Sequence, residues 1–206
     1  MTARDEVLAA VRAAVAGTAP VDVPRGYRQH DDRPVEELLD LLTDRLLDYK
    51  ASVRRVAAAG LADAVAEALG DARTCVVPAD LDDGWSAAWT TAGGRLVVDD
   101  RLDVAALDEV DAVLTGARVA IAETGTIVLD GGPGTGRRAI SLVPDHHVCV
   151  LHAADVVASV PLALTRLDPA RPLTWISGPS ATSDIELDRV EGVHGPRRLD
   201  VVLVAP

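Results

Sequence analysis

Apolar side chains recur every three to four positions in two early stretches, and this spacing predicts two amphipathic helices. The first covers residues 3–16, where valines stand at i, i+4 and i+8. The second begins at Pro34, because proline fits the first turn of a helix. Its predicted apolar face comprises Val35, Leu38, Leu39, Leu42 and Leu46.

The polar face of this second helix carries an acidic stripe, defined as Glu36, Asp40, Asp44 and Asp48. Carboxylates at i, i+4 spacing repel one another weakly, so the stripe does not help the helix to form. Two interpretations stay open: a solvated face, or a docking face for a basic partner.

The two helices are joined by residues 17–33, which contain two prolines, two glycines and no regular apolar spacing. Such a composition predicts a linker. Residues 1–33 are therefore expected to form a peripheral helix and linker. The remaining residues, 34–206, are long enough for one domain with a full core.

Short runs rich in Val, Leu and Ile alternate with helical patterns through that domain. This alternation predicts an α/β fold, with a single domain built on a mostly parallel sheet. Strands are expected at 52–56, 74–77, 96–98, 112–115, 148–151, 174–177 and 199–204, and helices at 61–70 and 103–109.

A glycine-dense stretch, residues 131–136, separates two further apolar runs and predicts a β-hairpin. Its expected strands are 127–129 and 139–143. No Gly-Lys-Ser/Thr sequence follows, and the spacing Gly132-x-Gly134-x-Gly136 differs from G-x-G-x-x-G. We therefore expect a flexible turn rather than a nucleotide-binding loop.

The composition narrows the class of protein. Hydrophobic residues make up 49% of the 206 residues, Phe is absent, and the net charge is -12. An aliphatic core suits buried strands, and so acidic a chain repels the phosphate backbone of nucleic acids. The N-terminus is charged and no apolar run reaches the length of a membrane span, so a cytoplasmic protein without a membrane span is expected.

Three arginine pairs each suit one anion: Arg54-Arg55, Arg137-Arg138 and Arg197-Arg198.

Cys75 and Cys149 both stand inside apolar runs, so buried free thiols are expected. Two cysteines do not hold an iron–sulfur cluster alone, since such clusters usually take four ligands. His147 shares a strand face with Cys149, which gives at most two metal ligands. No metal site is predicted.

Polar residues that follow predicted strands are the candidate chemistry, because ligands of α/β proteins bind at strand ends. Glu123 precedes one strand, beside Thr124, Gly125 and Thr126. A later loop suits an anion through its hydroxyls and backbone N–H groups, with a plain helix cap as the alternative. The candidate ligand-binding residues of this later region are Gly178, Ser180, Thr182, Asp184, Glu186, His194 and Gly195. The sequence does not show whether they share a pocket with Glu123.

These same residues carry a resemblance to a known family. The segments 122–126, 178–186 and 192–196 occur in the order found in the LutC/YkgG family, the LUD-domain proteins of lactate utilisation. The resemblance covers residues 35–205. It implies a fold like that of ribose-5-phosphate isomerase and CoA transferases. It also implies participation, with two iron–sulfur companion proteins, in the oxidation of L-lactate to pyruvate.

The missing cluster-binding cysteines fit the LutC-type member of that family. The resemblance supplies no catalytic assignment and no cofactor, and it does not decide whether this chain is itself an enzyme. By analogy with CoA transferases, it makes Glu123 a candidate reactive carboxylate.

Three functions follow. The first is a LutC-like subunit of a lactate-oxidising system that binds a small carboxylate or an anionic cofactor and works with iron–sulfur partners. The second is a non-catalytic assembly or regulatory subunit, suggested by the acidic stripe and the detached first helix. The third is a CoA-transferase-like acyl transferase with Glu123 as nucleophile.

Overall fold

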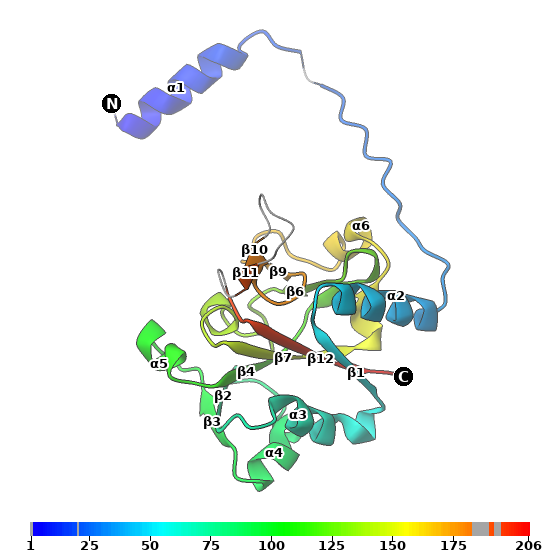
Figure 1. Cartoon of the computed structure of the whole chain (residues 1–206). Helices are drawn as coiled ribbons and strands as arrows, with labels where there is room; N and C mark the ends of the chain where they lie inside the picture. Colours follow the sequence, from blue (N-terminus) through cyan, green and yellow to red (C-terminus); the bar gives the residue numbers. More distant parts are fainter. Residues whose placement is uncertain (1, 20, 183–189, 192–194) are drawn as a thin grey trace.

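The computed structural model describes residues 2–19, 21–182, 190–191 and 195–206 (Figure 1). The helices are α1 (Ala3–Val15), α2 (Val35–Asp48), α3 (Leu61–Leu69), α4 (Ala87–Thr91), α5 (Val104–Asp108) and α6 (Val160–Leu164). The strands are β1 (Ser52–Val56), β2 (Thr74–Val77), β3 (Arg95–Val98), β4 (Ala112–Gly116), β5 (Val119–Ile121), β6 (Thr126–Leu129), β7 (His146–His152), β8 (Val156–Val157), β9 (Thr174–Ile176), β10 (Ala181–Thr182), β11 (Val190–Glu191) and β12 (Arg198–Val204). The short 3-10 turns include η3 (Ala122–Thr124) and η4 (Arg138–Ser141).

A six-stranded sheet with the order β1-β12-β7-β4-β2-β3 forms the centre of the domain. Every neighbouring pair in it is parallel. Helices α3 and α4 cover one face, whereas α2 and a second sheet cover the other (Figure 1). The prediction of a single α/β domain with a mostly parallel sheet is therefore confirmed.

The second sheet has the order β8-β5-β6-β9 and contains the β-hairpin of the fold. Its hairpin joins β5 to β6, which pair antiparallel with Ile121 opposite Thr126. The chain turns through η3 and Gly125, whose φ of 61° lies in the left-handed region that glycine adopts without strain. On its other edge β6 pairs antiparallel with β9.

The predicted return strand at 139–143 is wrong. Residues Arg138–Ser141 form the 3-10 turn η4 instead. Ile140 at its centre is fully buried and packs in one cluster with Val76, Leu107 and Val113. A short apolar run has the same pattern in a buried strand and in a buried turn, so the sequence alone did not distinguish the two.

Helix α2 buries four of the five residues that the apolar spacing of the sequence placed on its inner face. Leu38, Leu39, Leu42 and Leu46 are buried, but Val35 at the first position is 50% exposed, so its assignment to that face is wrong. Packing begins one turn into the helix, where its axis reaches the central sheet.

The acidic stripe on the other face of α2 is partly neutralised by arginines of the same chain. Arg55 on β1 binds both Glu36 and Asp40. Arg45 lies 3.4 Å from Asp44 and 3.7 Å from Asp48, measured from guanidinium nitrogen to carboxylate oxygen. The stripe therefore presents less free negative charge than the sequence suggested.

The first helix stands apart from this domain. Thr2 and Asp5 form a capping box at its start, but none of the residues of α1 is buried. Figure 1 shows α1 at the far end of an extended linker. Among the described residues, no helix combines the length and the apolar character that crossing a membrane requires.

The two cysteines are buried and free, as predicted. They lie in different layers: Cys75 packs in the core beneath α3, and Cys149 in the core beneath α2. Burial raises the pKa of each thiol to about 12, so both stay protonated at neutral pH.

Candidate functional site

A cavity of about 480 Å³ lies between β9, the start of β7 and η4, and we call it the serine pocket. It is lined by Arg138, Ser141, Leu142, His147, residues 173–180, Gly195, Pro196 and Leu199. Its volume is within the range of small-molecule sites. Three of the candidate residues, Gly178, Ser180 and Gly195, are part of its wall. The backbone N–H of Ser180 donates to the carbonyl of Pro196 at 2.8 Å, which holds these two segments together.

A chain of hydroxyls connects the serine pocket with the Glu123 segment. Ser177, in the pocket wall, shares a 2.8 Å hydrogen bond between its Oγ and Oγ1 of Thr126. The hydroxyls of Thr126 and Thr124 are also 2.8 Å apart. The pairing of β6 with β9 positions these groups, because it aligns Ile127 with Ile176. Two segments about fifty residues apart are thus joined by hydroxyls directly behind the pocket wall.

Arg138 is the cationic side chain of the serine pocket. The other five arginines of the three sequence pairs bind carboxylates of this chain: Arg54 and Arg198 bind Asp200, Arg55 binds Glu36 and Asp40, Arg137 binds Asp99, and Arg197 binds Asp145. Arg138 is exposed and has no ion-pair partner among the described residues. Its planar guanidinium therefore keeps donors available for a ligand carboxylate.

His147 is the buried titratable group of the pocket. Its Nε2 and Oγ1 of Thr115 share a hydrogen bond of 2.8 Å, and its side chain is 1% exposed. Burial lowers the pKa of His147 to about 3, because the charged imidazolium loses its hydration. The imidazole is therefore neutral at physiological pH and leaves Arg138 as the positive charge facing a ligand.

Glu123 lies outside the residues that line the serine pocket. One Nη2 of Arg28 contacts both of its carboxylate oxygens at 2.6 Å, and Nη2 of Arg33 contacts one of them at 2.7 Å. The Arg28 guanidinium, together with Arg33, holds the pKa of Glu123 below its ordinary value. The linker thus covers this carboxylate, and a role as nucleophile requires that the two arginines leave it.

Two candidate glycines have a packing role. A Cβ on Gly125 would approach the Cβ of Arg45 to 2.7 Å, and one on Gly178 would approach the Cβ of Tyr49 to 2.5 Å. Both glycines have positive φ, 61° and 86°. The end of α2 therefore rests directly on the backbone of both candidate segments and fixes their positions.

The remaining candidates are placed only in part. Thr182 belongs to β10, where its backbone pairs with Val190. Asp184, Glu186 and His194 lie outside the described residues. Thr124, Gly125 and Thr126 are behind the pocket wall rather than in it.

The sequence named Arg138 only within a pair suited to an anion, and it did not place His147 in a pocket. Arg138 was one of six paired arginines, and nothing in the chain marked it as the one without a carboxylate partner. His147 was considered only as a metal ligand on a strand. In both cases the missing information is the three-dimensional neighbour, which sequence spacing does not contain.

Comparisons with known proteins show the family of this chain. A family model described as the LUD domain matches residues 50–204. A Deinococcus radiodurans protein named Lactate utilization protein C is 47% identical over 98% of this chain and 95% of its own length. Proteins of the same name from Halalkalibacterium halodurans and Bacillus subtilis are 32% and 33% identical. Those two alignments span 47% and 45% of this chain and 45% and 41% of the relatives.

A solved structure has the same architecture. The crystal structure of a DUF162 family protein from Deinococcus radiodurans superposes with a TM-score of 0.70 at 41% identity. The match covers 84% of this chain and 99% of that one.

Proposed function

Because the chain belongs to the LUD domain family, we propose that it is a LutC-like component of a system that oxidises L-lactate to pyruvate, with the serine pocket as the site of a small carboxylate or anionic cofactor. The biological role is supported by the nearly full-length similarity to a protein named Lactate utilization protein C. The ligand is supported by one observation above all: Arg138 lines the pocket without an ion-pair partner among the described residues.

The proposed binding mode follows from the groups in the wall. A ligand carboxylate accepts two hydrogen bonds from the guanidinium of Arg138, the geometry in which arginine binds carboxylates best. The hydroxyl of Ser177 then donates a hydrogen bond to the 2-keto oxygen of pyruvate, or shares one with the 2-hydroxyl of lactate. His147 is neutral and forms part of the pocket wall. It therefore neither repels a cationic group of the ligand nor attracts a second anionic group.

Iron–sulfur companion proteins are part of the proposal, because the oxidation of lactate releases two electrons. The two cysteines of this chain lie on opposite faces of the central sheet and do not form a shared thiolate site. A cluster that takes four cysteine ligands is therefore supplied by another chain. On this account the protein acts in the cytoplasm as one part of a larger assembly.

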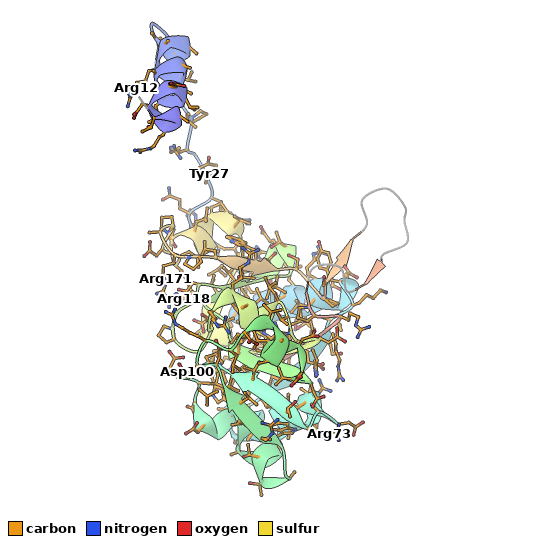
Figure 2. All side chains as sticks on the ribbon, turned by 90° about the vertical axis from the view of Figure 1, so that its left-hand side faces the viewer. Arg12, Tyr27, Arg73, Asp100, Arg118 and Arg171 are labelled. Atoms are coloured by element: carbon orange, nitrogen blue, oxygen red, sulfur yellow. The ribbon has the colours of Figure 1, made fainter. Side chains whose placement is uncertain are left out.

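A titration tests the ligand proposal. The purified chain is titrated with L-lactate and pyruvate by isothermal titration calorimetry, and the measurement is repeated with Arg138→Gln. We expect the variant to bind at least tenfold more weakly, because a charged hydrogen bond is worth about 1.5–3 kcal/mol. Arg12→Gln is the control, since Arg12 lies on α1 away from the domain (Figure 2). If the unmodified chain and Arg138→Gln bind L-lactate and pyruvate equally well, the serine pocket is not the binding site.

The assembly alternative makes a different prediction. In this test the chain is added to its iron–sulfur partners, and the rate of lactate-dependent dye reduction is measured. If the chain is a non-catalytic subunit, the unmodified chain and Arg138→Gln should restore the same rate. The ligand-binding account expects Arg138→Gln to lower the rate of that reconstituted system, while Arg12→Gln leaves the rate unchanged. If both variants support the full rate, the assembly role replaces the ligand role.

The acyl-transferase alternative rests on Glu123. Its carboxylate is bound by two linker arginines and lies outside the serine pocket, which does not favour a nucleophile. Incubation with a panel of acyl-CoA thioesters followed by intact-mass measurement tests this role. A covalent adduct that disappears in Glu123→Gln would support the alternative, and an unchanged mass would count against it.

A further inference from the structure

A second polar cavity, of about 360 Å³, opens where strands β4 and β6 end, and we call it the strand-end cavity. Ala117 and Arg118 directly follow β4, and Asp130 directly follows β6. The glycine-dense loop folds over this edge, with the N–H of Gly116 donating to the carbonyl of Gly134 at 2.7 Å. The strand-end cavity shares no lining residue with the serine pocket.

Asp130 is the buried anchor of the strand-end cavity. Its side chain is 7% exposed. One carboxylate oxygen, Oδ1, accepts from the N–H of Gly132 at 2.9 Å and from the hydroxyl of Thr135 at 3.3 Å. The other oxygen, Oδ2, has only two distant cations, Arg118 at 3.9 Å and Arg171 at 3.8 Å. Those distances exceed a direct hydrogen bond, so Oδ2 keeps room for a donor from a ligand.

Three arginines, Arg118, Arg166 and Arg171, line the cavity together with two further carboxylates, Asp155 and Asp168. Arg118 makes no side-chain hydrogen bond to any described residue. Arg171 is held by one bond from its Nε to the carbonyl of Asp130, and Arg166 by one from its Nη1 to the carbonyl of Ala154. Since a guanidinium has five N–H donors, each of the three retains several for an anion. Figure 2 shows Arg118 and Arg171 on the same side of the domain.

We propose that the strand-end cavity binds a phosphate ester that carries a free hydroxyl. The phosphoryl oxygens accept hydrogen bonds from Arg118 and Arg171, and the hydroxyl donates to Oδ2 of Asp130. A phosphate monoester carries close to two negative charges at neutral pH, which suits several guanidiniums better than a single carboxylate does. Two residues of the glycine-dense loop, Pro133 and Thr135, line the cavity, so this loop forms one of its walls.

The neighbouring space gives such a ligand room to extend. A further cavity of about 770 Å³ lies on the other side of the glycine-dense loop and shares Pro133 and Arg171 with the strand-end cavity. Strand β4 belongs to the parallel central sheet, and the carboxyl ends of such strands are where ligands of open α/β sheets bind. The position, the free guanidinium donors and the unused carboxylate oxygen thus point to the same kind of ligand.

Calorimetric titration of the full chain with glycerol 3-phosphate and with inorganic phosphate tests the proposal. We expect glycerol 3-phosphate to bind more tightly, because only it carries an alcohol hydroxyl that can donate to Asp130 while the separate phosphoryl group contacts the arginines. Arg118→Gln and Arg171→Gln should each weaken its binding about tenfold, the effect of losing one charged hydrogen bond. Arg73→Gln is the matched control, since Arg73 is exposed at the opposite end of the domain (Figure 2).

Asp130→Asn adds a test with a defined sign. Removing the negative charge should strengthen the binding of inorganic phosphate, while the advantage of glycerol 3-phosphate over phosphate shrinks. Circular dichroism checks that each variant is folded. If Asp130→Asn does not fold, Arg118→Gln still tests the proposal. The Arg118 side chain is 54% exposed, so replacing it should not disturb the core.

Three results would overturn the proposal: no heat with millimolar glycerol 3-phosphate, unchanged affinity in both arginine variants, or an equal loss in Arg73→Gln. Arg138→Gln separates the two sites. It should leave glycerol 3-phosphate binding unchanged, whatever it does to lactate and pyruvate. A failure of the serine pocket as a carboxylate site therefore leaves this proposal standing, and the reverse also holds.

Discussion

The hydroxyls of Thr126 and Ser177 lie 2.8 Å apart and join β6 to the residue that follows β9. This bond connects the motif around Glu123 with the wall of the serine pocket, although Glu123 itself faces the linker. It shows that the two motifs share one structural unit through their threonine and serine side chains.

That bond gives the first prediction. Thr126→Val keeps the shape of the side chain and leaves Ser177 without this partner. Because the Thr126 hydroxyl also bonds Thr124, the substitution removes two hydrogen bonds. We expect a loss of about 1–3 kcal/mol in the free energy of unfolding, at about 0.5–1.5 kcal/mol for each bond. Urea denaturation of Thr126→Val, Ser177→Ala and the double variant measures the coupling between them. If the two single losses simply add, the bond makes no contribution.

Gly125 and Gly178 give the second prediction. Gly125→Ala and Gly178→Ala each combine a positive φ with a Cβ that would lie under 3 Å from a neighbouring Cβ. Each should destabilise the domain by about 2–3 kcal/mol, from backbone strain and overpacking together. Gly134→Ala is the control, because its φ is 68° but nothing lies within 4 Å of the added Cβ. It should cost about 1 kcal/mol, and an equal loss in all three would mean that contact with α2 does not matter.

His147 gives a prediction on pH. Its pKa is lowered from 6.5 to about 3, so its charge does not change between pH 6 and pH 8. Arginine also stays charged over this range. The affinity of the serine pocket for pyruvate should therefore be constant from pH 6 to pH 8, which calorimetric titrations at several pH values measure. A tenfold rise in affinity toward pH 6 would show that an imidazolium takes part.

The same shift has a consequence for stability. Because the folded pKa of His147 lies below the unfolded value, the unfolded chain binds the extra proton first as pH falls. The contribution of His147 to the free energy of unfolding is fully present above pH 6.5. It is lost progressively as the pH falls from 6.5 to 3. His147→Gln should flatten the dependence of the unfolding free energy on pH within that window, as seen in urea denaturation at each pH.

The linker gives the next prediction. Arg28 and Arg33 bind Glu123 and hold residues 28–33 against η3. In the double variant Arg28→Gln and Arg33→Gln, trypsin should cut the remaining linker site at Arg25 faster than in the unmodified chain. Glu123→Gln should have the same effect, since it removes the shared partner. Arg12→Gln provides the control, and equal cleavage rates in all four chains would mean that these ion pairs do not hold the linker.

The sequence predicted most elements of the central sheet and the burial of one face of α2. Those predictions succeeded because parallel strands and amphipathic helices leave clear apolar patterns. It missed β5, which has only three residues and follows β4 after only two residues, and it mistook η4 for a strand. Elements this short contain too few residues for their periodicity to be distinctive.

The candidate site was predictable only as separate motifs. Gly178, Ser180 and Gly195 do lie in one cavity, but the sequence did not show that Arg28 and Arg33 cover Glu123 from about ninety residues away. Nor did it show which arginine of six faces the serine pocket. These relationships depend on strand pairing between distant segments, which has no local signature.

The most direct test of the account is a crystal structure of the chain grown with pyruvate. The account predicts the pyruvate carboxylate in the serine pocket, within hydrogen-bond distance of the Arg138 guanidinium, with its keto oxygen near Ser177. Pyruvate bound elsewhere, with the serine pocket holding only water, would contradict it.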